Sequence, residues 1–492
     1  MSHQLNVAIL LGAAVVLVGV VAVRLSSRLG LPSLLVYLAI GLVLGESVLG
    51  IRFDDAELTR HLGLAALILI IAEGGLASRW KEVRPAMAAA SILATFGVLV
   101  SVAVVGALVH VLFDFDWRLS LLYGAVLSST DAAAVFSTLR RLPLRPRLVA
   151  IVEAESGMND AIVVLLVVML SSASTGFHWT QIPEAVFELV GGALIGLVIG
   201  AIGSWALQRV ALPSAGLYPL AAVGLTVFAY AVGAIAGVSG FIAIYVAGIV
   251  IGNTKMPHRQ AILGFADGLG WLAQIGLFVL LGLLASPARL VHAVIPGLII
   301  GAILLFLARP LSVSLSVAPL GYGWREQLFL SWAGLRGAVP IVLATVPLSE
   351  ALPGAVHLFD VVFVVVVIFT IVQGTALPPV ARFARVTAAS QPTELRVETA
   401  PLDRLQADLL EFDIPIGSKL AGVYIDELRL PVGAVVTMVL RDGVGFVPER
   451  RTRLRALDSL LIVATQDVRD AAEERVAAVS LSGSLARWYR PL

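Results

Sequence analysis

The chain has 492 residues, of which 59% are hydrophobic and 14% are charged, and its formal net charge is +1. Soluble globular proteins are about 45–50% apolar and about 25% charged, so the composition excludes an ordinary soluble enzyme or nucleic-acid-binding protein. The absence of cysteine excludes a disulfide framework and thiolate metal chemistry.

Apolar segments of about 20 residues follow one another from Leu5 to about Ala384, and each is long enough to cross a bilayer core of about 30 Å. We expect residues 1–385 to form an all-α polytopic membrane protein with about thirteen transmembrane helices. The expected spans are 5–23, 32–50, 62–77, 86–112, 118–138, 148–171, 185–208, 216–236, 239–252, 264–285, 290–308, 326–346 and 357–381.

Basic residues are abundant in alternate loops and scarce in the others. By the positive-inside rule the basic loops are cytoplasmic, which places the N-terminus outside the cell and the C-terminus inside. The basic residues assigned to cytoplasmic loops are Arg24, Arg28, Arg79, Lys81, Arg84, Arg140, Arg141, Arg145, Arg147, Arg209, Lys255, Arg259, Arg309, Arg325, Arg382 and Arg385.

The composition changes after Arg385. Residues 386–400 are predicted to be a polar linker, and residues 401–475 a small cytoplasmic α+β domain with strand-length apolar runs and an Asp442-Gly443 turn. Residues 476–492 form a tail. Its Trp488 and Tyr489 suit a membrane interface, although a frayed end is the simpler interpretation.

The stretch "EAESGMNDAIVV" at residues 153–164 places polar side chains at membrane depth, where charged groups are costly. Ser156 and Asp160 share one helix face, and Glu155 and Asn159 share the adjacent face. The first face offers a hydroxyl and a carboxylate as hard oxygen ligands for a cation. A packing hydrogen bond from a protonated Asp160 is the alternative.

Two other spans contain polar interruptions. In "VLSSTDAAAVF" the run from Ser128 to Asp131 can satisfy backbone groups that an unwound helix frees. In "SWAGLRGAVP" Arg336 lies between glycines, so a second broken helix is expected, with free carbonyls or Glu155 as the partner of Arg336. Straight helices, with an arginine reaching the interface, are the alternative. Two interrupted spans seven apart indicate inverted repeats with a midplane site.

Glu73, in "LILIIAEGGL", lies in the third expected span. It is either a second carboxylate of the cation site or a packing residue near the cytoplasmic end.

With these motifs in order, the sequence resembles the monovalent cation:proton antiporter-1 family, of NhaP type. The carrying residues are Thr130-Asp131, the block from Glu155 to Asp160, and "GLRGAV" around Arg336. The resemblance implies the sodium/proton antiporter fold, with two crossing broken helices, a homodimer and alternating access. Residues 401–475 resemble a TrkA-C domain, an attachment similar to that of the potassium/proton branch.

The resemblance also implies roles for individual residues. Asp160 would bind cation and proton alternately, and the transported cation is the only metal ion expected. Ser156, the Thr130 backbone and Glu73 would help to coordinate it. The residues implied to support the site are Glu155, Asn159, Arg336 and Asp131.

We therefore expect an electroneutral K⁺/H⁺ antiporter without a cofactor, since one titrating carboxylate carries either one proton or one cation. Na⁺ or Li⁺ exchange for H⁺ is the alternative. A potassium channel is remote, because "GYG" at 321–323 lacks the preceding Thr-Val of a selectivity filter. An intramembrane aspartyl protease using Asp131 and Asp160 is more remote, because neither residue lies in a Gly-x-Gly-Asp setting.

The predicted cytoplasmic domain carries several arginines. They are either a solvated face or a site for a small anionic regulator such as a nucleotide. The arginines in question are Arg441, Arg450, Arg451, Arg453 and Arg455.

Overall fold

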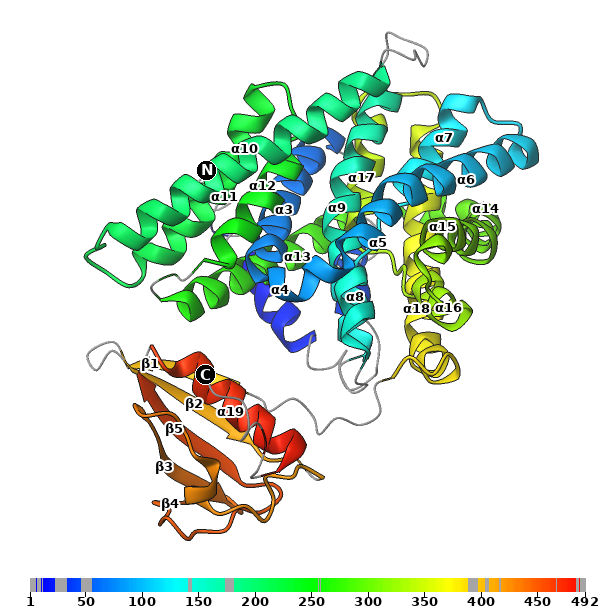
Figure 1. Ribbon diagram of the computed structural model, residues 1–492. Coiled ribbons are helices and arrows are strands. Elements are labelled where there is room, and N and C mark those ends of the chain that lie inside the picture. The colour runs from blue at the N-terminus through cyan, green and yellow to red at the C-terminus, as the bar shows by residue number, and fades with distance from the viewer. Residues whose placement is uncertain are drawn as a thin grey trace. The chain divides into compact units, whose positions relative to one another are not determined.

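A computed structural model describes residues 6, 10, 12–22, 33–45, 55–139, 144–172, 181–254, 256, 258–387, 397–402, 407–415, 417–465, 467–483 and 486. It divides into two compact units, Met1–Val386 and Thr387–Leu492 (Figure 1). Most of the predicted linker and the two aromatic residues of the tail, Trp488 and Tyr489, lie outside the described residues. So do Arg24, Arg28, Arg140, Arg141 and Lys255.

The first unit is built from helices. Short 3-10 or π turns join some of them, notably the π turns at Leu93–Gly97 and Leu304–Ala308. In chain order the helices are α2 (Ser33–Leu44), α3 (Ala56–Ala77), α4 (Trp80–Val83), α5 (Met87–Ile92), α6 (Val98–Phe113), α7 (Trp117–Val126), α8 (Ala132–Leu139), α9 (Pro146–Ser171), α10 (Gln181–Arg209), α11 (Leu217–Ile235), α12 (Gly240–Gly252), α13 (Arg259–Leu284), α14 (Pro287–Ile303), α15 (Arg309–Val317), α16 (Trp324–Trp332), α17 (Ala338–Ser349) and α18 (Ala355–Phe383).

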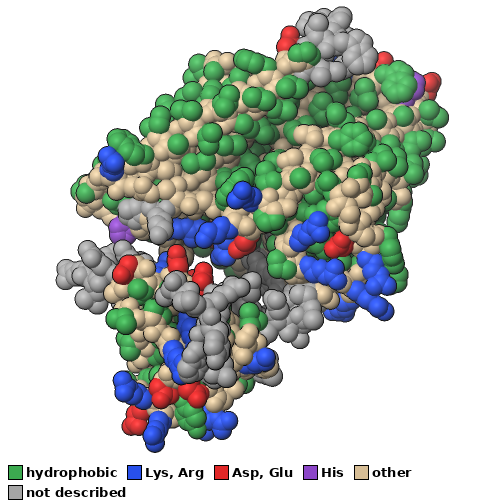
Figure 2. Space-filling view, in the orientation of Figure 1, with side chains coloured by type: hydrophobic (Ala, Val, Ile, Leu, Met, Phe, Trp, Pro, Cys, Tyr) green, Lys and Arg blue, Asp and Glu red, His purple; other side chains and the backbone are tan. Residues whose placement is uncertain are grey.

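The surface of this unit is apolar over wide areas. Among the described residues, seven helical stretches are long and apolar enough to cross a membrane. Figure 2 shows hydrophobic side chains over much of the visible face. Large hydrophobic patches are rare on soluble monomers, so the prediction of a multi-pass membrane protein is confirmed, while the number thirteen stays a prediction. The exposed apolar side chains of α10 are Val186, Phe187, Val190, Leu194, Leu197, Val198, Ile202 and Trp205.

The order of elements repeats within the helical unit, as predicted. α2 crosses α13 where a Cβ on Gly41 would lie 2.8 Å from the Cα of Gly282, and α3 crosses α12 where a Cβ on Gly75 would lie 3.2 Å from the Cα of Gly248. The two crossings occupy equivalent places in the two halves. Each half continues with a 34-residue helical stretch, Trp80–Phe113 or Pro287–Leu320, and ends with an interrupted helix and a long helix.

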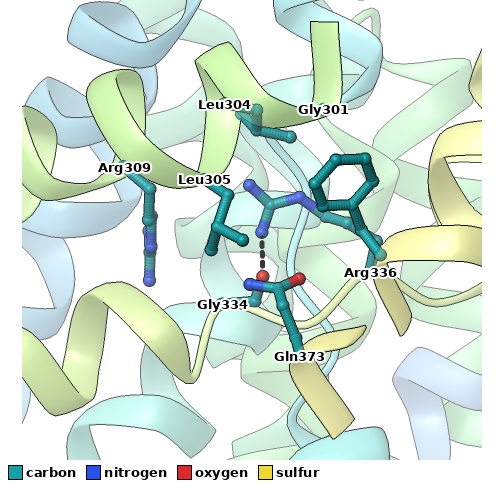
Figure 3. A pocket seen from close by; sticks show the side chains of 8 residues that line it. Gly301, Leu304, Leu305, Arg309, Gly334, Arg336 and Gln373 are labelled. Atoms are coloured by element: carbon teal, nitrogen blue, oxygen red, sulfur yellow. Dashed lines mark hydrogen bonds between the residues drawn. The ribbon is translucent and has the colours of Figure 1, made fainter. Parts of the chain in front are cut away.

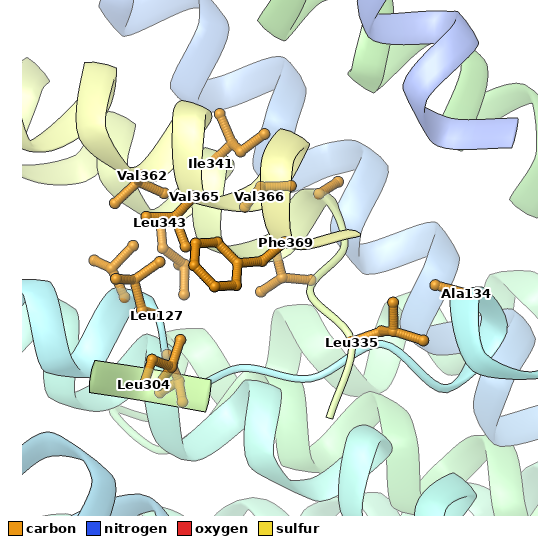
Figure 4. Packing of buried hydrophobic residues seen from close by; sticks show 14 of the residues in the cluster. Leu127, Ala134, Leu304, Leu335, Ile341, Leu343, Val362, Val365, Val366 and Phe369 are labelled. Carbon is orange, nitrogen blue, oxygen red and sulfur yellow. The ribbon is translucent and has the colours of Figure 1, made fainter. Parts of the chain in front are cut away.

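Both predicted interruptions are present, and they meet. The chain is not helical between α7 and α8 or between α16 and α17, and the Asp131 N–H donates to the Leu335 carbonyl across the crossing at 2.8 Å. Apolar side chains surround the crossing, among them Leu127, Leu335 and Phe369 (Figure 4). Water is therefore excluded from most of this region, so freed backbone groups must find partners in the protein.

The second unit is a five-stranded antiparallel sheet in the order β1-β2-β5-β3-β4 with one helix. The sheet's alternate residues Leu460 and Ile462 are buried in a core that includes Val476 of the helix. The predicted Asp442-Gly443 turn joins β3 to β4, and both residues have positive φ, as a type I′ hairpin requires. The elements are β1 (Val397–Leu402), β2 (Ala407–Asp413), β3 (Ala434–Arg441), β4 (Val444–Phe446), β5 (Ser459–Thr465) and α19 (Arg469–Ser482).

Candidate cation site

Asp160 lies in α9 and faces the unwound segment between α7 and α8. It is 7% exposed, and the Ser129 hydroxyl donates to its Oδ1 at 2.6 Å. Ser129 belongs to the polar run that predicted the interruption, but it was not predicted to lie in the site. Its position beside Thr130 in that run is the signal that could have identified it.

The unwound segment is bound to α9 through Thr130. Ser156 Oγ donates to the Thr130 carbonyl at 2.8 Å, and Asn159 Nδ2 donates to Thr130 Oγ1 at 2.7 Å. The Ala132 N–H donates in turn to Ser156 Oγ at 3.2 Å. The same unwound segment therefore forms hydrogen bonds with Ser156, Asn159 and Asp160, although the helical periodicity assigns these residues to two faces of α9. The segment wraps far enough round α9 to meet both.

The grouping suits a small hard cation. Carboxylate, carbonyl and hydroxyl oxygens are the ligands that such cations prefer, and Asp160, Thr130 and Ser156 supply one of each kind. In this conformation each of these oxygens already has a hydrogen-bond partner. A cation that binds here must therefore replace these hydrogen bonds.

Asp131 lies at the crossing of the two interrupted helices. Its Oδ1 accepts a hydrogen bond from the Ala134 N–H at 3.2 Å, near the start of α8. Its Oδ2 lies against Gly337, the residue before α17, so closely that a Cβ on Gly337 would overlap the carboxylate. A negative charge at the N-terminal ends of two helices is stabilised by both helix dipoles.

Glu155 forms its ion pair with Arg309, and the predicted pairing with Arg336 is wrong. Arg309 Nη1 and Nη2 donate to the two carboxylate oxygens at 2.6 and 2.9 Å, and the residues are 5% and 1% exposed. The assignment of Arg309 to a cytoplasmic loop is also wrong. The π turn before Arg309 lets the helix continue into α15, so Arg309 lies inside the unit and opposite α9.

Arg336 is 2% exposed and bonds to the backbone of its own broken helix. Its Nη1 donates to the Gly334 carbonyl, and its own carbonyl accepts from Thr370 Oγ1 at 3.1 Å. Two further groups reach the C-terminal turn of α16: Arg309 Nη2 lies 3.4 Å from the Leu330 carbonyl and Gln373 Nε2 lies 3.3 Å from the Trp332 carbonyl. Of the two partners predicted for Arg336, the free carbonyls are the ones it meets.

Glu73 lies apart from the hydrogen-bonded group. It is half-buried on α3, against Gly270 of α13, and no described residue forms a hydrogen bond or ion pair with it. It interacts electrostatically with Asp267, Asp131 and Glu153. The structure thus places Glu73 in an acidic neighbourhood that attracts cations, but does not bring it to Asp160, Ser156 or Thr130.

Known families and relatives match both units. Residues 13–383 match the transmembrane sodium/hydrogen exchanger family, and residues 409–477 match the TrkA-C domain. The chain is 35% identical over 97% of its length to the K⁺/H⁺ antiporter NhaP of Alkalimonas amylolytica, covering 85% of that protein. It is 35% identical over 99% of its length to the K⁺/H⁺ antiporter NhaP2 of Shewanella oneidensis, covering 86% of it.

A more distant relative is the Na⁺/H⁺ antiporter 1 of Methanocaldococcus jannaschii, 27% identical over 70% of the chain and 84% of that protein. The solved structure of the sodium proton antiporter MjNhaP1 from the same organism superposes with a TM-score of 0.68 at 23% identity, covering 77% of this chain and 99% of that one. That similarity shows the fold. The chain belongs to the sodium/hydrogen exchanger family, as a multi-pass membrane antiporter that also carries a TrkA-C domain.

Proposed function

We propose that the protein exchanges K⁺ for H⁺, one for one, across a bacterial inner membrane, and so serves potassium, pH and cell-volume homeostasis. The full-length relatives named K⁺/H⁺ antiporters support K⁺ as the substrate. The relative named a Na⁺/H⁺ antiporter is less similar, at 27% identity over 70% of the chain, so Na⁺ or Li⁺ exchange is the second candidate.

The observation that carries the proposal is the contact of a single buried carboxylate, Asp160, with an unwound polar segment. When Asp160 carries the cation, Ser156 and the Thr130 carbonyl would supply further oxygens. When it carries the proton, the Ser129 hydroxyl can rotate to accept from it. Asn159 adds no second titrating group, because it is a neutral amide that holds Thr130. One loaded cation therefore replaces one proton.

The remaining polar residues would keep the two half-helices in place during the cycle. Asp131 would stabilise two helix N-termini, and Arg309, Arg336 and Gln373 would hold the end of α16. Transport of this kind moves ions without breaking a covalent bond, so we assign no catalytic residue and no cofactor. Glu73 would attract the cation rather than hold it in this conformation.

The channel alternative has an observation against it. Tyr322 of "GYG" is 5% exposed, its hydroxyl accepts from Arg147 Nε at 2.9 Å, and the guanidinium lies 3.9 Å from the ring centroid. A tyrosine held in this way joins the start of α9 to the turn before α16.

We also propose the orientation and the partners. Exposed arginines gather where α9 begins, α16 begins and α18 ends, which favours a cytoplasmic face there, and Figure 2 shows Lys and Arg along that edge of the helical unit. The apolar surface of α10 would contact lipid or a second copy in a homodimer.

In the TrkA-C domain, Arg441 is already paired with the Asp458 carboxylate. An anionic regulator would therefore contact Arg450, Arg451, Arg453 or Arg455 instead.

The test uses purified protein in liposomes with an acid interior and a pH-sensitive dye inside. K⁺, Na⁺ or Li⁺ is added outside, and the loss of the pH gradient is followed, with Asp160→Asn as the control. Dissipation by K⁺ at the lowest concentration supports the proposal. Dissipation by Na⁺ and Li⁺ alone replaces K⁺ by the second candidate.

A further inference from the structure

A small cavity lies beside the broken helix that carries Gly334 and Arg336. Its volume is about 10 Å³, close to what one ordered water or small ion needs. Figure 3 shows the Arg336 side chain reaching across it toward the helix that carries Leu304, Leu305 and Arg309. Gln373 and Phe369 complete the lining. Two arginine side chains thus line a space otherwise walled mainly by apolar groups.

The hydrogen bonds of these arginines are incomplete. The Nε atoms of Arg309 and Arg336 are both buried, and neither has a hydrogen-bond partner among the described residues. Glu155 occupies only the Nη atoms of Arg309. A buried N–H donor without an acceptor costs about 1–3 kcal/mol, and more when the group is charged, so two such donors beside one cavity indicate an acceptor within it.

The charges are also unbalanced. Arg336 interacts electrostatically with Arg309 and with Glu155, so two guanidinium groups share one carboxylate inside the membrane. The carbonyls at the end of α16 offset part of this excess through the helix dipole, but they carry only partial charge. A full positive charge at membrane depth is costly unless it is paired.

Gly334 is the reason that both arginines reach the same place. A Cβ on Gly334 would lie 2.7 Å from Arg309 Nε and 3.1 Å from Arg336 Nη1. The missing side chain therefore leaves the space in which the two guanidinium groups converge. Any larger residue would push one of them aside.

We propose that this cavity binds a small monovalent anion of the size of chloride. The anion accepts hydrogen bonds from Arg309 Nε and Arg336 Nε and balances the second arginine. It is a structural ligand rather than a transported ion, because none of Asp160, Ser156 and Thr130 lines the cavity. A water molecule fits the same volume but leaves the excess charge, which is why the anion is the better occupant.

The first experiment measures binding, so it does not depend on the proposed transport reaction. The full-length protein in detergent is melted in KCl, KBr and potassium gluconate at equal K⁺ and equal ionic strength. Chloride and bromide should raise Tm saturably by about 2–4 °C over gluconate, as a ligand of the folded state does. Crystals grown in bromide should show an anomalous peak between Arg309 and Arg336.

Gly334→Ala tests the location. Its methyl group enters the space between the guanidinium groups and removes no charge, so the apparent chloride affinity should fall at least about tenfold. Gly276→Ala in α13 is the matched control, since a Cβ there meets nothing within 4 Å, and it should keep the chloride effect. Equal Tm in chloride and gluconate, together with no bromide peak in the wild-type protein, would overturn the proposal and leave water as the occupant.

Discussion

Glu155 and Arg309 form a bidentate ion pair at 2.6 and 2.9 Å, and both residues are almost fully buried. The pair joins α9, which carries Asp160, to α15. α15 follows the π turn Leu304–Ala308 in the long helical stretch of the second half. The helix that carries the candidate exchange carboxylate is therefore tied to the scaffold by a charge pair in a low-dielectric setting.

Replacing one member of the Glu155–Arg309 pair should lower the stability of the folded protein more than replacing Arg336. We expect Arg309→Leu to destabilise the helical unit by about 3–5 kcal/mol, because Glu155 is left buried without its counter-ion. Thermal melting of the purified protein measures this. The double variant Glu155→Leu/Arg309→Leu should recover much of the loss, since neither charge remains. Wild-type melting of Arg309→Leu would show that the pair contributes nothing.

Replacing Asp160 or Asp131 by asparagine should have different effects on exchange and on stability. Asp160→Asn should abolish cation-dependent proton movement in liposomes while Tm stays within about 2 °C of wild type, since a buried charge is removed rather than orphaned. Asp131→Asn should retain some exchange but lower stability by about 1–2 kcal/mol, because the charge at two helix N-termini is lost. Proton-coupled exchange at the wild-type rate in Asp160→Asn would exclude this residue as the carrier.

Several features of the site could be predicted from residue patterns alone. Polar runs and glycines inside apolar spans revealed both interrupted helices, and the charge of Glu155 at membrane depth marked it as a paired residue. The partner of Glu155 was not predictable in the same way. Arg309-Pro310 after an apolar run resembles the end of a span, and nothing local indicates the π turn that continues the helix.

The contacts made by the two faces of α9 could not be predicted for a related reason. A helical wheel shows which residues share a face of α9, but not that the non-helical segment of Ser129 and Thr130 bonds to both Asp160 and Asn159. Side chains on two faces then meet one segment. Such contacts depend on the tertiary path of the chain, so spacing along α9 cannot give them.

The closest approach at the crossing depends on Gly337. We expect Gly337→Ala to lower Tm by about 5 °C or more and to reduce exchange, because a Cβ would overlap the Asp131 carboxylate. Gly323→Ala is the matched control, since it precedes α16 with a φ of −69° and a Cβ there meets nothing within 4 Å. If both variants melted at the same temperature, the tight packing of Asp131 on Gly337 would be excluded.

The TrkA-C domain offers a prediction about pH. Asp458 is 1% exposed, and it accepts two hydrogen bonds from Arg441 and one from the Arg455 N–H, each at 2.8 Å. Burial by itself raises the pKa of Asp458, but these hydrogen bonds and charges outweigh it and hold the pKa below its usual value. The ionised form is therefore bound more tightly in the folded domain than in the unfolded chain.

A carboxyl whose pKa is lowered by folding stabilises the folded state above its unfolded pKa, near 4, and loses that contribution as pH falls further. We expect Asp458→Asn to destabilise the domain by about 2 kcal/mol at pH 7 and to weaken its loss of stability between about pH 5 and pH 3. Hydrogen exchange of β5 in the full-length protein, corrected for the intrinsic effect of pH, measures both. Asp442→Asn in the exposed turn is the control and should leave the pH profile unchanged. If Asp458→Asn lost as much stability on acidification as the wild type, Asp458 would not be the group that responds.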